Sequence, residues 1–120
     1  MTQPVSYVEL NSPDLAATSR FFQDVFGWDA QPFAAPDYLV APHGDGPGVD
    51  AGMLASRDGH PRTVPVIRID SLDELRPRLE QGGGTIVVEP FTLPGVGRGC
   101  YFTDPAGLLV GLHEYDPQAH

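Results

Sequence analysis

The sequence contains the same order of expected elements twice, and this internal repeat restricts the fold more than any other feature. A strand at residues 5–10 precedes a helix at residues 15–26, and a strand at residues 63–69 precedes a helix that begins after Asp70. The polar pairs that begin the two helices, Asn11-Ser12 and Asp70-Ser71, lie 59 residues apart. Each half therefore predicts one β-α-β-β-β module that cannot bury its sheet alone.

Three more strands are expected in each half. They lie near residues 28–33, 38–41 and 49–55 in the first half, and at residues 85–89, 99–103 and 108–114 in the second. Pro77 lies inside the second helix and predicts a kink or an early end. We expect one domain over residues 1–120, built from modules at about residues 4–57 and 62–116. The predicted fold class is α+β, with the paired modules forming a curled eight-stranded mixed sheet around a concave cleft.

Charge and cysteine content exclude several classes of protein. The chain has 7 basic residues, all of them arginine, against 16 acidic residues, and its net charge is −9. Nucleic acids and anionic membranes are therefore poor partners, because both need clustered cations. The single Cys100 excludes an internal disulfide and a multi-cysteine zinc site. No apolar run approaches the roughly 20 residues of a membrane span, and no signal peptide is evident, so we expect a cytoplasmic protein.

Three segments, taken together, resemble the vicinal oxygen chelate superfamily, which contains the glyoxalases, bleomycin-resistance proteins and extradiol dioxygenases. The segments are Val8-Glu9-Leu10 with Asp14-Leu15 and residues 21–28; residues 66–70 with Gly82-Gly83; and residues 94–98, 101–107 and 112–114. The resemblance covers about residues 5–116. It implies paired modules whose sheet curls around a ligand cleft.

Many members of that superfamily hold a divalent metal through about four His, Glu or Gln side chains on the first and last strands of each module. The resemblance places these positions at Val5 or Tyr7, Ala51 or Met53, Val64 or Val66, and Gly111. None of these residues is a good metal ligand. We therefore expect no cofactor, and we disfavour a site for Zn, Ni, Mn or Fe.

Glu9 and His113 share the inward parity of the lost ligand positions and are the candidate catalytic residues. They could form an acid-base pair or bind a metal weakly; alternatively, Glu9 pairs with Arg68 and His113 is a partly buried strand histidine. Arg98 lies in a glycine-rich loop and could clamp a carboxylate or phosphate. The candidate ligand-binding residues are Tyr7, Trp28, Tyr38, Met53, Val66, Arg68, Phe91, Arg98 and Tyr101.

Three functions stay open at this point. The first is a small-molecule-binding protein without the catalytic metal, which sequesters a drug or a metabolite. The second is a metal-dependent lyase, isomerase or dioxygenase. The third is a metal-free enzyme in which Glu9 or His113 moves a proton. The resemblance and the exposed sheet edges favour a homodimer.

Overall fold

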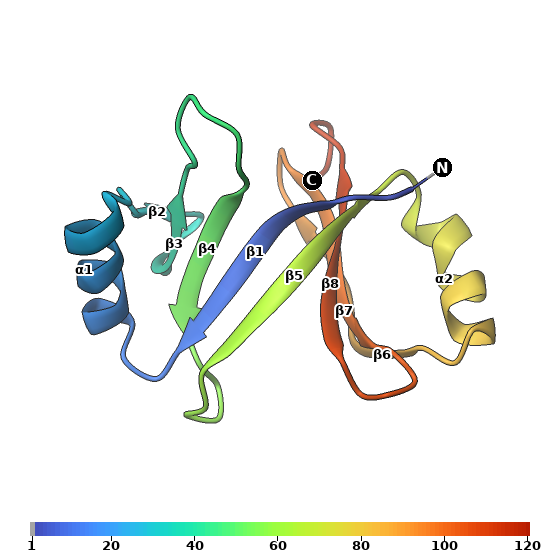
Figure 1. The fold of residues 1–120 in the computed structure, drawn as a ribbon. Helices are drawn as coiled ribbons and strands as arrows, with labels where there is room; N and C mark the ends of the chain where they lie inside the picture. The colour runs from blue at the N-terminus through green and yellow to red at the C-terminus, as the bar shows by residue number, and fades with distance from the viewer. Residues whose placement is uncertain (1) are drawn as a thin grey trace. The chain divides into compact units, whose positions relative to one another are not determined.

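The computed structural model describes residues 2–120, which divide into two compact units (Figure 1). The first module comprises Ser6–Val64, and the second comprises residues 2–5 and Pro65–His120. In Figure 1 the first module runs from blue to green, and residues 65–120 of the second run from yellow-green to red. Each module contains one helix and four strands.

The first module has a mixed sheet with the strand order β2-β3-β4-β1. Its elements are β1 (Val5–Ser12), α1 (Leu15–Phe26), β2 (Gln31–Phe33), β3 (Ala35–Ala41) and β4 (Asp50–Ala55). β1 and β4 are parallel, whereas β3 pairs antiparallel with both β4 and β2. A parallel pair needs a long connection, and α1 with the following hairpin supplies it.

The second module repeats this plan with the strand order β5-β8-β7-β6. Its elements are β5 (Arg62–Ile69), α2 (Leu72–Gln81), β6 (Thr85–Leu93), β7 (Gly97–Thr103) and β8 (Leu109–Tyr115). β5 and β8 are parallel, and β7 lies antiparallel to its two neighbours. The predicted fold class and the internal repeat are confirmed. β2 is shorter than the strand expected at residues 28–33.

Both helices begin at capping side chains of the expected kind. The Asp14 side chain accepts a hydrogen bond from the Ala17 N–H at 3.1 Å, and the Ser71 hydroxyl accepts one from the Glu74 N–H at 3.2 Å. α2 continues through Pro77 to Gln81, so the helix does not end early at this proline, which has no N–H for a hydrogen bond within the helix. Within residues 2–120, neither helix is long and apolar enough to cross a membrane.

The core of the second module lies between α2 and one face of its sheet. Its buried residues are Ile69, Leu72, Cys100 and Leu112. Side chains alternate along a strand, so the neighbours of these residues point to the opposite face. Arg68 on β5 and His113 on β8 therefore share the face away from α2. Burial raises the pKa of the Cys100 thiol, which disfavours a nucleophilic role.

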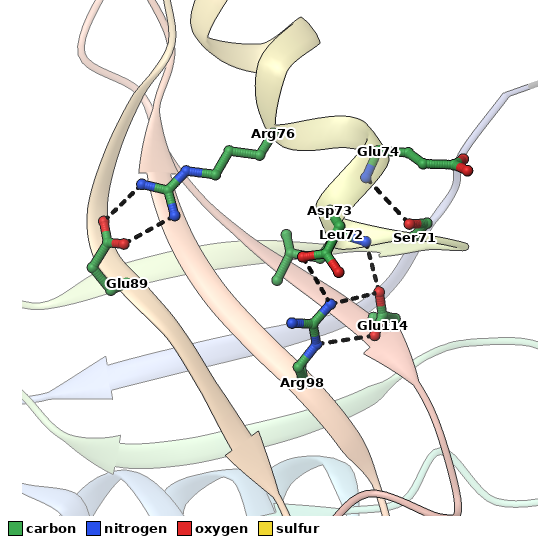
Figure 2. Close-up of polar contacts among 8 residues, drawn as sticks. All are labelled: Ser71, Leu72, Asp73, Glu74, Arg76, Glu89, Arg98 and Glu114. Carbon is green, nitrogen blue, oxygen red and sulfur yellow. Dashed lines mark hydrogen bonds and ion pairs between the residues drawn. The ribbon is translucent and has the colours of Figure 1, made fainter.

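Glu114 on β8 connects the sheet to the first turn of α2 (Figure 2). Its Oε2 accepts a hydrogen bond from the Leu72 N–H at 2.6 Å, and its Oε1 accepts one from Arg98 Nε at 3.1 Å. Arg98 also lies 3.4 Å from Asp73 on the same helix. The hydrogen bonds from Arg98 and Leu72 hold the pKa of Glu114 below its ordinary value. One carboxylate thus satisfies an N–H group that the helix itself cannot satisfy.

The position of Arg98 corrects the expectation for this residue. Arg98 lies within β7 rather than in a flexible loop, opposite Glu114 in the ladder. Its guanidinium is held by Glu114 and Asp73 on the face that carries α2 (Figure 2). Arg98 therefore joins β7 to β8 and α2, on the face of the sheet opposite to His113 and Arg68.

We predict that Glu114→Gln lowers the free energy of unfolding by about 1–3 kcal/mol, because a charged acceptor shared by Leu72 and Arg98 is lost. Urea titration followed by circular dichroism measures the change. Glu80→Gln is the matched control, since Glu80 makes only an exposed pair with Arg76 at 3.6 Å. The control should lose no more than about 0.5 kcal/mol. Equal losses in both variants would show that Glu114 does not anchor α2.

Candidate functional site

Two tyrosines and a glutamate come together on one face of the first module. We call this group, Tyr7, Tyr38 and Glu9, the phenol-carboxylate cluster. The hydroxyl oxygens of Tyr7 and Tyr38 are 2.8 Å apart, and the Tyr38 hydroxyl donates to Glu9 Oε2 at 2.5 Å. Glu9 is 7% exposed, while both tyrosines are only half-buried. The cluster thus combines a buried carboxylate with two half-buried tyrosines.

Gly52 on β4 makes room for this cluster. The ladders place Gly52 beside Glu9 of β1 on one side and Val40 of β3 on the other. A Cβ atom at Gly52 would collide with the hydroxyl oxygens of Tyr7 and Tyr38 and lie 2.9 Å from Tyr38 Cζ. The missing side chain is therefore what allows rings from two different strands to meet above β4.

Both phenols keep their protons at neutral pH. Burial raises the pKa of Tyr7 to about 12, and the neighbouring carboxylates Glu9 and Asp50 contribute to this rise. Burial and the hydrogen bond to Glu9 raise the pKa of Tyr38 well above its ordinary value. Ionising either hydroxyl would place a second negative charge beside Glu9, which the half-buried environment opposes.

A second group lies on the face of the second module away from α2. The Arg68 guanidinium lies over the Tyr115 ring at 5.0 Å, and the Tyr115 ring makes an edge contact with His113. His113 Nε2 is buried without a hydrogen-bond partner among the described residues. Burial, followed by the charge of Arg68, lowers the pKa of His113, while the Val96 backbone acts in the opposite sense.

Aromatic rings cover two glycines on this same face. The Phe91 ring lies over Gly99, and its Cζ would be 2.9 Å from a Cβ there. The Tyr101 ring and the Val66 side chain likewise lie close to the position that a Cβ atom at Gly111 would occupy. Phe91 and Tyr101 stack on each other with ring centroids 6.1 Å apart. This part of the second module is an apolar surface beside Arg68 and His113.

The structure thus groups some of the residues expected to form a site and separates others. Tyr7, Tyr38 and Glu9 form one group, and Val66, Arg68, Phe91, Tyr101 and His113 share one face of the second module. Met53 is completely buried and, as the neighbour of Gly52, points to the other face of β4. The Trp28 ring packs on Phe22 with centroids 4.7 Å apart. The structure therefore gives Met53 and Trp28 packing roles.

Two residues of these groups were not expected from the sequence. Gly52 matters only because rings from β1 and β3 need its space, and no local pattern reveals such a need. Tyr115 follows His113 by two residues on β8, so strand alternation alone could have placed it beside His113.

Comparison with known proteins agrees with this architecture. A family model described as the Glyoxalase/Bleomycin resistance protein/Dioxygenase superfamily matches residues 5–112. The chain belongs to this superfamily. It is 31% identical over 132 residues to the anthracycline biosynthesis protein DnrV of Streptomyces peucetius, a match that covers 89% of this chain and 45% of DnrV. The chain spans 44–45% of the length of the curated relatives that it matches.

Solved structures show the same fold. The Mn(II)-bound glyoxalase from Novosphingobium aromaticivorans is 26% identical, with a TM-score of 0.70 over 99% of this chain and 41% of the glyoxalase. A methylmalonyl-CoA epimerase from Streptomyces coelicolor has a TM-score of 0.68 over 100% of this chain and 99% of the epimerase. The epimerase is only 14% identical, so it supports the fold alone.

The donor set of the phenol-carboxylate cluster does not fit a divalent metal. Within residues 2–120, no three His, Cys, Asp or Glu side chains lie close enough together to hold an ion. The phenol-carboxylate cluster offers one carboxylate with two protonated phenols, and Gly52 and Gly111 offer no side chain. Resident zinc and manganese sites use several imidazole or carboxylate ligands. The donor set therefore differs from what an ion such as the Mn(II) of that glyoxalase requires.

We predict that Gly52→Ala destabilises the first module by about 1–3 kcal/mol, because the new methyl group forces the Tyr7 and Tyr38 hydroxyls apart. Thermal and urea unfolding measure the loss. Gly46→Ala is the control, since a Cβ at Gly46 meets nothing within 4 Å. Adding Tyr7→Phe to Gly52→Ala should recover part of the loss by removing one of the colliding oxygens. Additive effects in that double variant would contradict the proposed collision.

A second prediction concerns pH. Burial, followed by the charge of Arg68, lowers the pKa of His113 below 6.5, whereas the Val96 carbonyl and Glu114 act in the opposite sense. The unfolded chain therefore binds the proton more readily, and this contribution to stability is lost as pH falls below about 6.5. Urea titrations from pH 8 to pH 5 should show wild type losing stability relative to His113→Gln. A constant difference between the two proteins across this range would refute the assignment.

Proposed function

We propose that the chain binds a small, mostly apolar molecule on the first module at the phenol-carboxylate cluster, without a divalent metal centre. The observation that carries this proposal is the convergence of Tyr7, Tyr38 and Glu9 above Gly52. Small-molecule sites typically combine aromatic surface with a few convergent polar groups. The space at Gly52 lets the Tyr38 hydroxyl reach Glu9 and the Tyr7 hydroxyl reach Tyr38, which gathers three polar groups at one place.

The relatives suggest which molecules to try. DnrV is named as an anthracycline biosynthesis protein, and the description of the superfamily includes bleomycin resistance. Both names connect relatives with antibiotics, anthracyclines in one case and bleomycin in the other. We therefore propose sequestration or carriage of such a molecule, and we rank it above metal-dependent lyase, isomerase or dioxygenase chemistry because the donor set does not fit a metal. A homodimer, a cytoplasmic location and acid-base chemistry by Glu9 or His113 stay predictions.

The test uses doxorubicin, a fluorescent anthracycline, and metal-free bleomycin, with protein dialysed against a chelator. We expect saturable binding of at least one probe, measured by fluorescence or calorimetry. Tyr38→Phe should weaken that binding about 5- to 10-fold, which corresponds to the loss of about one hydrogen bond. Tyr115→Phe is the matched control, because Tyr115 belongs to the second module, and it should leave the affinity unchanged.

Two outcomes would contradict this proposal. The first is saturable binding of neither probe, or binding to which Tyr38→Phe makes no difference. The second is near-stoichiometric metal, measured by plasma mass spectrometry in untagged protein expressed with Zn, Ni, Mn and Fe supplied. That result, with probe binding that requires the metal, would move attention to Glu9 and His113 as ligands.

A further inference from the structure

The hydrogen bonds of the phenol-carboxylate cluster run in one direction only. A phenol has a single O–H hydrogen, and that of Tyr38 is donated to Glu9 Oε2 at 2.5 Å. The contact between the Tyr38 and Tyr7 oxygens at 2.8 Å therefore has Tyr7 as its donor. The Tyr7 hydrogen is used in this way, and its oxygen can only accept a further hydrogen bond.

Reversing this chain of bonds is unfavourable. For Tyr7 to donate outward, the 2.8 Å contact between the two hydroxyl oxygens would have no hydrogen between them, because the Tyr38 hydrogen points to Glu9. Turning the Tyr38 hydrogen toward Tyr7 would take a strong hydrogen bond from a carboxylate that is 7% exposed. The oxygen of Tyr7, a half-buried residue, is thus a preorganised acceptor.

The charges around Tyr7 also favour a hydrogen-bond donor, and in particular a positively charged one. Glu9 and Asp50 are the charged groups that act on the Tyr7 hydroxyl, and both are carboxylates. Asp50 lies beside Tyr7 in the ladder between β1 and β4. The chain as a whole carries a net charge of −9, which attracts cations and repels anions at a distance.

We propose that the ligand of the first module carries a nitrogen donor, and preferably an ammonium group, that the Tyr7 oxygen accepts while an aromatic or apolar body covers the neighbouring surface. This inference rests on the proposed function and specifies the chemical class of its ligand. A carboxylate or phosphate would meet an acceptor oxygen and two carboxylates, so this position repels anionic ligands.

Three naphthalene probes of similar size test this inference: 2-naphthylmethylamine, 2-naphthylmethanol and 2-naphthoate. Each is titrated into ¹⁵N-labelled protein at pH 7, and the shifts of the Gly52 backbone amide and its neighbours give the dissociation constant. We expect the amine to bind at least about 10-fold more tightly than the carboxylate, with the alcohol between them.

Two variants identify the atom responsible. Tyr7→Phe keeps the ring and removes the acceptor, so it should weaken binding of the amine about 5- to 10-fold and leave 2-naphthoate unchanged. Tyr115→Phe, in the second module, should change neither. Because Tyr7 donates to Tyr38 and not to Glu9, Tyr7→Phe leaves the hydrogen bond between Tyr38 and Glu9 in place.

The outcomes separate this inference from the proposed function. If 2-naphthoate shifts the NMR signal of the Gly52 amide at the same concentrations as the amine, the nitrogen-donor inference is overturned. The proposed binding site then still stands. If Tyr7→Phe leaves the amine affinity unchanged, the Tyr7 oxygen is not the acceptor, and the inference also fails. If no probe shifts Gly52 or its neighbours, both the inference and the proposed site are overturned.

Discussion

The parallel register of the first strand with the last strand of each module is the constraint on which the rest of the structure depends. In the first module this register sets Glu9 beside Gly52, and in the second it sets Arg68 beside His113. Side chains alternate with a period of two, so a slip by one residue would exchange the two faces of a strand. Glu9 would then point to the face of Met53, where a carboxylate would have to be buried in a packed core.

The two modules share a backbone plan but present different chemistry. The first module offers hydroxyl and carboxylate oxygens above Gly52. The second offers the Arg68 guanidinium, the buried Nε2 of His113 and a stacked pair of aromatic rings. In both, glycines on the central strands leave space that aromatic side chains from neighbouring strands fill. An internal repeat can therefore conserve strand order while its surfaces diverge.

The sequence predicted the repeat, the helix starts and the face shared by Tyr7 and Glu9, because local periodicity and capping determine these features. It did not predict the role of Gly52, which depends on two rings that meet from different strands. The expectation of a loop at Arg98 was wrong. A run of glycines resembles a loop in sequence, but the ladder in which Arg98 pairs with Glu114 extends β7 back to Gly97. Periodicity determines the face of a side chain, but its partner across the sheet depends on register.

Cys100 lies 1% exposed beneath α2, in the same core as Leu72 and Leu112. It is the only cysteine of the chain, and its thiol is hidden by the element that Glu114 and Arg98 fasten to the sheet. A thiol reagent can reach it only when α2 separates from β7 and β8. The rate at which such a reagent modifies the native protein therefore reports how readily the second module opens around this core.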